Sequence, residues 1–388
     1  MNESLKIKSF NLDPALFSAI IALLILGMIM VSSASITLAD NTIGDPNFFL
    51  FRHFGAIVIG LVGASIAIAI PTELWFRLNG LLFLAAIALL ISVFIPGLGH
   101  TVNNSTRWLD LGPVTFQPSE LARFCLLLYL CGYIVRRQTE LKTTLLGFLK
   151  PMALIAIACG LLLKEPDFGA TVVLTATSLC LLFVGGARLR DFLGCFVIAV
   201  AILFGLAMTT RERLERLTTF LDPWADPYES GFQLTQSLIA IGRGDWFGVG
   251  LGDSVQKLFY LPEAHTDFVF AVMAEELGFV GVTLTIILFG IVIFKAIAMG
   301  LNASKVGRPF QGLVSTGIGL SLGFQVFINI GVNSGMLPTK GLTLPLISYG
   351  RTSVVVTLIM LGVLVRSYHE LQLAAQDMSV REARKKSR

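Results

Sequence analysis

The chain of 388 residues is 55% hydrophobic and only 14% charged. Because about a quarter of the residues in soluble globular domains are charged, this composition excludes an ordinary soluble domain and indicates a polytopic membrane protein. The net charge of +4 is small, and we expect no nucleic-acid partner. The five cysteines lie in or beside apolar runs without a CxxC spacing, and the sequence has no recognisable nucleotide-binding loop.

Ten apolar segments follow one another along the chain, most of them near the ~20 residues that a helix needs to cross a bilayer. The fifth and sixth are short and are joined at residues 164–167, which predicts a tight helical hairpin. The first is longer than the roughly 7–15 apolar residues of a signal peptide, so we interpret it as an uncleaved anchor. The expected segments are 14–35, 52–70, 78–96, 119–135, 148–163, 169–186, 190–208, 268–296, 310–331 and 346–366.

Lysine and arginine are distributed unevenly between the two sides of these segments. With the N-terminus inside, 18 of the 29 fall on the cytoplasmic side, as the positive-inside rule requires. We therefore predict an all-α polytopic membrane protein with ten transmembrane helices, both termini cytoplasmic, and a large external loop (209–267) between helices 7 and 8. The expected parts are a cytoplasmic tail (1–12), a transmembrane domain (13–367) and a basic cytoplasmic tail (368–388), the last frayed and attracted to anionic lipid.

The stretch 260–278 carries several ionisable side chains directly before and inside an apolar segment. They include His265, Asp267 and the pair Glu275 and Glu276. Ionisable groups at membrane depth are costly and commonly functional. On the residues alone, Asp267 is interpreted as a helix-capping side chain at least as well as a general base.

A second polar stretch, residues 103–123, precedes the fourth apolar segment. Pro118 is suited to the first turn of a helix, and Glu120 and Arg123 are three residues apart, so they share one face of that helix. The residues alone slightly favour a structural salt bridge over a catalytic pair.

Two further stretches are polar. Residues 329–353 are rich in Gly, Pro and small polar residues at membrane depth, where irregular backbone must be buried in protein or line a cavity. By its position alone, Lys340 in this stretch is interpreted equally well as a functional cation and as an ordinary surface lysine. The loop 209–267, of about 60 residues, is too long for a simple connector and is expected to fold into a cap. Its arginines, Arg213 among them, either bind phosphate or pair with the acids of the loop.

Three segments, LPEAHTDFVFAVMAEELG, STRWLDLGPVTFQPSELAR and GMLPTKGLTLPLISYG, together resemble the SEDS family of bacterial cell-wall synthesis. The resemblance covers about residues 14–367 and, on the wording of residues 337–345, is closer to the division members of the family than to the elongation members. It implies ten transmembrane helices and a peptidoglycan glycosyltransferase that polymerises lipid II on the outer face of the plasma (inner) membrane, at the division septum. Phe259 and Arg351 depart from the family pattern, outside the expected catalytic set.

The resemblance also implies catalytic roles. Asp267 matches the essential acid of the family and is expected to act as the general base on the 4-hydroxyl of the acceptor sugar. Glu120 and Arg123 match the charged pair of the fourth helix. We expect these three side chains to form one charge network that sets the position and the pKa of Asp267.

The leaving group in such a reaction is a polyprenyl pyrophosphate, which requires positive charge nearby. No tightly bound cofactor is expected. A Mg²⁺ or Mn²⁺ ion can accompany the pyrophosphate, because Mg²⁺ typically binds through one or two carboxylates plus substrate phosphates. No residue is assigned to a metal, and the candidates for substrate binding are Arg107, Lys340, Arg213, His265 and Ser348.

Two other functions stay open. A lipid II flippase has the same composition but requires polar groups through the full depth of the bilayer, whereas here they concentrate at the outer ends of the fourth, eighth and tenth segments. A non-catalytic division scaffold tolerates loss of the Asp267 carboxylate. By family, the expected partners are lipid II, a single-span class B penicillin-binding protein (a transpeptidase of the FtsI type) and other divisome membrane proteins.

Overall fold

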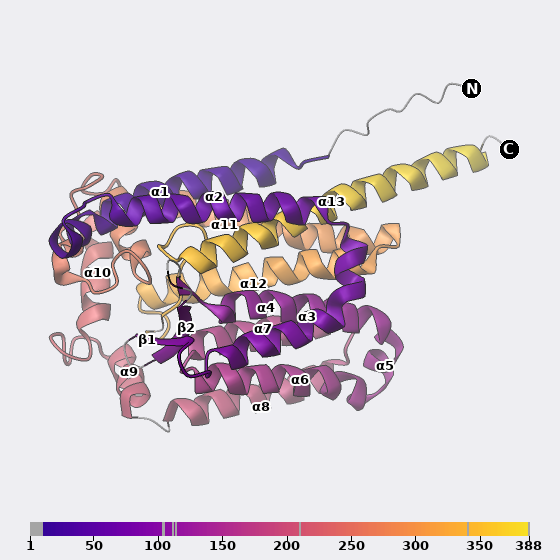
Figure 1. The fold of residues 1–388 in the computed structure, drawn as a ribbon, viewed down its shortest axis with the longest axis horizontal. Helices are drawn as coiled ribbons and strands as arrows, with labels where there is room; N and C mark the ends of the chain where they lie inside the picture. Colours follow the sequence, from indigo (N-terminus) through magenta and orange to yellow (C-terminus); the bar gives the residue numbers. More distant parts are fainter. Residues whose placement is uncertain are drawn as a thin grey trace.

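The structure is a computed structural model that describes residues 11–102, 105–110, 112, 115–208, 211–339 and 341–386. Long helices run side by side, with the start of α1 and the end of α13 at one end of the bundle and a small sheet toward the other (Figure 1). The helices are α1 (Pro14–Ile43), α2 (Phe48–Ala69), α3 (Thr72–Ser92), α4 (Pro118–Arg136), α5 (Gln138–Thr143), α6 (Leu145–Lys164), α7 (Phe168–Val184), α8 (Leu189–Met208), α9 (Arg211–Leu221), α10 (Phe232–Gly244), α11 (Val269–Ala303), α12 (Pro309–Asn333) and α13 (Arg351–Lys386).

Local sequence signals set several helix ends. Helix α1 begins at Asp13, whose side chain accepts the N–H of Leu16, and it has proline at its first position. It ends at Gly44, which adopts the left-handed conformation and donates its N–H to the backbone carbonyl oxygen of Asp40. Helix α7 begins in the same way, with Asp167 accepting the N–H of Ala170. The caps therefore mark the connections between successive helices.

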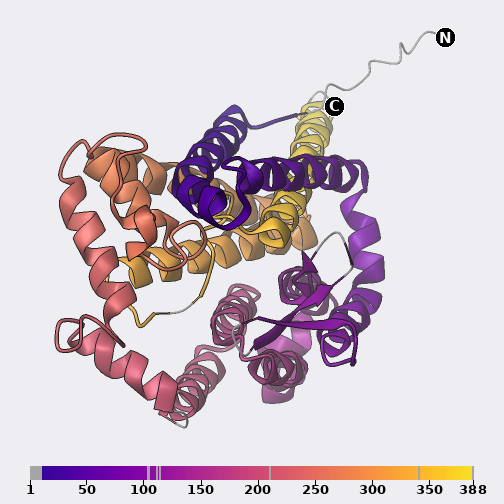
Figure 2. The same cartoon turned by 60° about the vertical axis from the view of Figure 1, so that its left-hand side comes forward.

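The helices form two groups joined by α12. Helices α1, α2, α11 and α13 pack with one another, and α3, α4, α6 and α7 form the second group, while α12 contacts α11, α13, α4 and α7. Seen along the bundle, the magenta helices and the strands lie together, apart from the indigo and orange helices (Figure 2). Helices α2 and α13 approach closely at Gly362, where a Cβ atom would stand 2.6 Å from the carbonyl oxygen of Ala64. Small residues at such a crossing allow close packing of membrane helices.

The membrane character expected from the sequence is confirmed. Within the part of the chain that the structure describes, nine helices are long and apolar enough to cross a membrane, and α7, with 17 residues, is a shorter apolar helix. Each of the ten apolar segments expected from the sequence coincides with one of these helices.

The expectation of an all-α fold is wrong for the stretch before α4. Strands β1 (Gly99–Val102), β2 (Ser105–Asp110) and β3 (Thr115–Phe116) form an antiparallel sheet in the order β1-β2-β3. Threonine, tryptophan and valine favour a pleated, half-buried surface, and this signal is visible in the sequence once the polar stretch is considered as a hairpin.

Two further elements differ from the expectation. Helix α11 is broken at Gly278, whose φ of 65° and ψ of −166° are not helical, so residues 269–277 form a separate half-helix. The tail that was expected to fray continues α13 as far as Lys386. Residues 370–386 contain neither glycine nor proline, which removes the usual reasons for a helix to end.

The loop between α8 and α11 is folded. It contains α9, α10 and a five-residue π-helix, η1 (Gln256–Tyr260). Phe259 in η1 has a φ of 69°, and Glu263 beyond it has a φ of 56°, both unusual for residues with side chains. The chain that leads to Asp267 therefore holds two strained positions.

Candidate active site

A cavity of about 780 Å³ opens at the end of the bundle that carries the sheet. Its polar lining comes from segments far apart in the sequence. The walls include parts of β2 and β3, the first turn of α4, the turn before α7 with its first residues, α9, α10, Glu263, residues 265–268, Thr339, residues 341–343 and the start of α13.

Asp267 lines this cavity, two residues before the start of α11. Its backbone carbonyl oxygen accepts a hydrogen bond from Nδ2 of Asn329 at 2.9 Å and another from Nδ2 of Asn333 at 3.0 Å. The side-chain oxygen of Asn333 in turn accepts the N–H of Ala271 at 3.2 Å. Helix α12 thus fixes the backbone from the carbonyl of Asp267 to the N–H of Ala271, while Asp267 lines the cavity.

The surroundings of Asp267 favour its protonated form. Burial raises the pKa of Asp267 to about 7, and the carboxylate of Glu263 contributes to the rise. The guanidinium of Arg107 lowers this pKa, while Asp167 raises it slightly. A carboxylate with a pKa near the working pH combines a useful ionised fraction with real basicity, which suits it to accept a proton in catalysis.

Arg107 is held at the rim of the cavity by backbone carbonyls. From β2, its Nε donates to the carbonyl oxygen of Glu165 at 3.1 Å, and its Nη2 donates to that of Pro166 at 2.5 Å. These two bonds orient the guanidinium without neutralising it, because carbonyl oxygens carry no net charge. The cation therefore stays available to an anionic group in the cavity.

The turn before α7 carries two acids, of which Asp167 lines the cavity and Glu165 is buried. Asp167 lines the cavity, caps α7 and accepts hydrogen bonds from Gln117 at 3.4 Å and Ser119 at 3.3 Å. The side chain of Glu165 is fully buried, and neither of its carboxylate oxygens has a hydrogen-bond partner. Burial, together with the Asp167 carboxylate, raises the pKa of Glu165 to about 8, against the lowering effect of Arg107. From the sequence, residues 164–167 are predicted only to connect a helical hairpin.

Glu120 and Arg123 form the ion pair that their spacing predicts. The pair is buried, Glu120 lines the cavity, and Nη2 of Arg123 also lies 3.4 Å from the side-chain oxygen of Gln325. Among the contacts of the described residues, none joins either side chain to the Asp267 carboxylate. The expected network of Asp267, Glu120 and Arg123 is therefore wrong. The charged groups that shift the pKa of Asp267 are Glu263, Arg107 and Asp167.

An amide ladder on α12 makes an indirect connection. Gln325, Asn329 and Asn333 are spaced four residues apart, so they lie on one face of the helix. Gln325 contacts Arg123 and donates to the carbonyl of Thr343, while the two asparagines hold the Asp267 backbone. Three amides at this spacing in an apolar helix are a signal that sequence reasoning missed.

The structure separates the two substrate-binding candidates His265 and Ser348. His265 lines the cavity, with its ring 5.0 Å from Phe49 and 5.6 Å from Tyr349, and burial lowers its pKa against the raising effect of Glu263. Ser348 is buried outside the lining, and its Oγ accepts the N–H of Leu344 at 2.7 Å. Ser348 therefore stabilises the turn at residues 344–348, and its role in substrate binding stays a prediction.

The remaining candidates are basic residues. Arg107 lines the cavity, whereas Lys340 lies outside the described residues, although its neighbours Thr339 and Gly341 are part of the lining. Arg213 lies in α9, and its side chain is also outside the described part of the chain.

Two arginines that were not among the candidates line the cavity. They are Arg216 of α9 and Arg351, which donates to Thr115 of β3 at 2.6 Å. The departure from the family pattern at Arg351 therefore lies in the lining of the cavity. Within the described ranges, no group of three or more His, Cys, Asp or Glu side chains is arranged to hold a metal ion.

These features define an integral membrane protein with an enzyme-like cavity at one end of a helical bundle. The family described as "Cell cycle protein", which covers FtsW, RodA and SpoVE, matches residues 14–373. The chain therefore belongs to this family, the SEDS proteins.

Individual relatives agree with this membership. A protein of Thioalkalivibrio sulfidiphilus named "Probable peptidoglycan glycosyltransferase FtsW" is 52% identical over 360 residues, which are 93% of this chain and 90% of the relative. The solved structure of the rod shape determining protein RodA from Thermus thermophilus is 30% identical, with a TM-score of 0.67, and the match covers 93% of this chain and 98% of that one. A chain from a structure described as "Structural coordination of polymerization and crosslinking by a peptidoglycan synthase complex" is 33% identical, with a TM-score of 0.75 over 92% of this chain and 98% of that one.

Proposed function

We propose that this protein polymerises lipid II into glycan strands at the division septum, with Asp267 as the general base. The enzyme class follows from the relatives: the chain is a peptidoglycan glycosyltransferase, as are the homologues at about half identity over more than nine-tenths of its length. The observation that carries the role of Asp267 is its carboxylate, with a pKa raised to about 7, in a cavity lined by guanidinium groups.

The chemistry assigns one proton transfer to Asp267. The 4-oxygen of the acceptor sugar forms a bond to the anomeric carbon of the donor, and the bond from that carbon to the pyrophosphate oxygen breaks with inversion. The proton of the hydroxyl passes to the Asp267 carboxylate, and the electron pair leaves with the polyprenyl pyrophosphate. A base positioned in this way contributes roughly 10²–10⁴-fold to the rate.

The leaving pyrophosphate requires positive charge, which this site supplies as guanidinium groups. Arg107, Arg216 and Arg351 line the cavity from three different elements, and guanidinium groups bind phosphates through paired N–H bonds. Lys340 and Arg213 remain predictions for the same role. A Mg²⁺ or Mn²⁺ ion, where present, enters with the pyrophosphate as part of the substrate.

The topology that fits this reaction has ten spans with both tails in the cytoplasm and residues 209–267 outside. It is supported by the position of the cavity, at the end of the bundle away from the start of α1 and the end of α13 (Figure 1). Reporter fusions after Arg137 and Arg388 should be cytoplasmic, and fusions near Asp110 and Ser237 external. An external reporter after Arg388 contradicts the ten-span arrangement.

The polymerised strand must then be crosslinked, so the partner should be a transpeptidase. Similarity to a chain of a peptidoglycan synthase complex supports a single-span class B penicillin-binding protein as that partner, with other divisome membrane proteins beside it at the septal inner membrane.

The experiment is lipid II polymerisation by the purified chain reconstituted with its class B transpeptidase, comparing wild type with Asp267→Asn. Glycan strands from wild type and none from the variant are the expected result. Transfer of lipid II across the vesicle membrane without glycan product indicates the flippase instead. Near wild-type polymerisation by Asp267→Asn removes the base assignment.

A further inference from the structure

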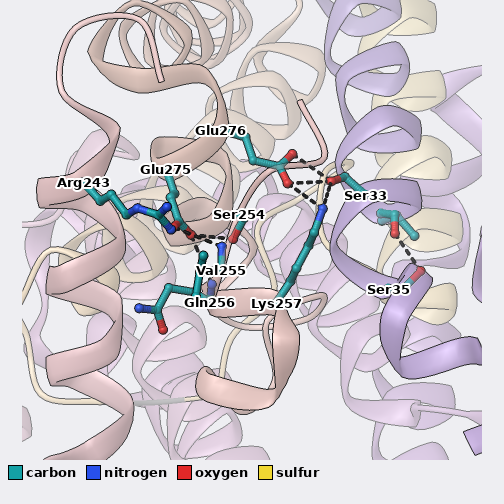
Figure 3. A network of polar contacts seen from close by, with 10 residues as sticks. Ser33, Ser35, Arg243, Ser254, Val255, Gln256, Lys257, Glu275 and Glu276 are labelled. Atoms are coloured by element: carbon teal, nitrogen blue, oxygen red, sulfur yellow. Dashed lines mark hydrogen bonds and ion pairs between the residues drawn. The ribbon is translucent and has the colours of Figure 1, made fainter. Parts of the chain in front are cut away.

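Two adjacent glutamates of the half-helix 269–277 are completely buried outside the cavity. Glu275 and Glu276 are 0% and 1% exposed, and their side chains point in different directions (Figure 3). A carboxylate is costly to bury unless it is paired and hydrogen-bonded. Each glutamate meets that condition with partners from other elements, which connects α11 to its neighbours.

Glu275 holds the segment that precedes η1. Its carboxylate accepts Nη1 of Arg243 from α10 at 2.8 Å and the hydroxyl of Ser254. It also accepts the backbone N–H groups of Val255 at 3.2 Å and Gln256 at 3.4 Å. Four donors on one carboxylate fasten the entry to η1 (Figure 3).

Glu276 joins η1 to α1. Nζ of Lys257 lies 3.0 Å from its carboxylate and 3.0 Å from Oγ of Ser33, and Ser33 donates to the same carboxylate at 2.6 Å. The side chain of Lys257 is only 5% exposed, so this ion pair is screened little by solvent. We call Ser33, Lys257 and Glu276 the latch.

The half-helix that carries both glutamates is separated from the rest of α11 by Gly278. The N–H groups of residues 279–280 and the carbonyls of residues 275–276 bond to residues 245–250, at 2.8 to 3.2 Å, in place of the helical bonds. A Cβ atom at position 278 would stand 2.3 Å from the nitrogen of Gly248. The half-helix is therefore packed into the loop and not continuous with the membrane helix.

In the chain, Asp267 lies between Lys257 of the latch and the half-helix. The connecting residues 258–266 include the two positions with positive φ, Phe259 and Glu263. Leu258, Phe259 and Tyr260 are about half exposed, whereas Leu261 and Ala264 are buried. The stretch is fixed at Lys257 by the latch, at the carbonyl of His265 by the N–H of Tyr349, and at Asp267 by the asparagines of α12. Its start, next to the latch, is therefore the part that is held least by packing.

We infer that the latch positions Asp267 for catalysis, an inference that rests on the role of Asp267 proposed above. Ser33, Lys257 and Glu276 join three elements, α1, η1 and α11, at one point, and the strained segment that ends at Asp267 starts there. None of the three is among the described residues that line the cavity, so they are positioning residues and not catalytic residues. Release of the latch lets residues 258–266 relax and moves the carboxylate from its working place.

The test separates positioning from stability. Removing one member of a buried ion pair strands the other charge, whereas replacing both with apolar side chains of similar size is often neutral or stabilising. The double variant Lys257→Met/Glu276→Met therefore removes the latch without stranding a charge. The matched control is Glu73→Met/Arg77→Met, which removes an exposed ion pair of α3.

The expected result for the double variant is a melting temperature close to wild type, a turnover number for lipid II polymerisation lower by about 10²-fold, and a KM that changes little. A displacement of about 1 Å in a catalytic group has an effect of that size. Deuterium uptake at residues 258–266 should rise, and the control variant should match wild type in all three measurements. Wild-type turnover together with unchanged uptake in the double variant overturns the inference.

A milder variant covers the case in which the double variant does not fold. Ser33→Ala keeps the ion pair but detaches it from α1, and it should raise uptake at residues 258–266 and lower turnover. Unchanged uptake in Ser33→Ala overturns the latch whatever the activity shows. Polymerisation by Asp267→Asn in the same assay contradicts the base and leaves the uptake measurement valid, so the two failures are distinguishable.

Discussion

The protein contains buried carboxylates in two regions, which differ in the number of hydrogen-bond donors and cations around each carboxylate. In and beside the cavity wall, burial raises the pKa of Glu165 to about 8 and that of Asp267 to about 7, and neighbouring carboxylates add to both rises. Neither carboxylate oxygen of Glu165 has a hydrogen-bond partner. The half-helix that follows Asp267 is only about 14 Å long, at 1.5 Å per residue. At its other end Glu275 accepts four donors and Glu276 accepts two, one of them a buried cation.

This difference distinguishes acids suited to catalysis from acids that hold the fold together. A carboxylate with incomplete compensation keeps a proton that it can exchange near neutral pH, which is useful for catalysis. A carboxylate with cations and several N–H or O–H donors is held in place and is expensive to disturb. Burial alone therefore does not distinguish an active-site acid from a structural one. A small number of donors around the buried carboxylate does.

The largest effect should come from neutralising the cavity acid. Asp267→Asn should lower the rate of lipid II polymerisation by about 10²–10⁴-fold, because the base is lost. Its melting temperature should not fall, since the carboxylate is poorly compensated. The control is Asp253→Asn, an exposed acid of the same loop, which should keep wild-type activity. A variant that loses activity only through unfolding contradicts the contrast between the two regions.

Arg123→Ala removes the partner of Glu120, an acid that lines the cavity but is paired. Loss of the guanidinium leaves Glu120 buried without its partner, which typically costs about 3–5 kcal/mol in the free energy of unfolding. Arg137→Ala, at a side chain that is 65% exposed, should cost less than about 1 kcal/mol. Thermal unfolding in detergent measures both. Equal and small losses imply that Glu120 is not held by this pair.

Glu165→Gln should change how stability depends on pH. The pKa of Glu165 is raised in the folded protein to about 8 from an ordinary 4.5, so folding binds a proton between these pH values. Stability of the wild type is therefore lost as pH rises through this window. The variant should lose that dependence and be more stable relative to wild type at pH 8 than at pH 5, because a glutamine cannot ionise. If the melting temperatures of wild type and variant change with pH in parallel, the raised pKa of Glu165 is contradicted.

The smallest effect concerns the pH profile of the reaction. The rate should rise with pH through about 7, as Asp267 loses its proton. Because the Glu263 carboxylate raises the pKa of Asp267, Glu263→Gln should shift this rise to lower pH by less than about one unit. Polymerisation rates measured from pH 5.5 to 8.5 give the shift. A shift to higher pH implies that Glu263 acts mainly by another route.

The sequence by itself determined the membrane class, the ten apolar helices and the pair Glu120 and Arg123. These depend on the apolar content of local windows and on the spacing of helix neighbours, which short-range physics decides. The motif that contains Asp267 was also visible, and its resemblance to a family indicated the chemistry.

Only the tertiary structure decided which groups surround Asp267. Arg107 lies 160 positions earlier in the chain, the asparagines of α12 lie more than 60 positions later, and Ser33 meets Glu276 across 243 positions. Such pairs depend on how helices pack and in which register, and no local pattern specifies this. The break at Gly278 belongs to the same class, because its missing helical bonds are replaced by a loop that only the folded chain brings into reach.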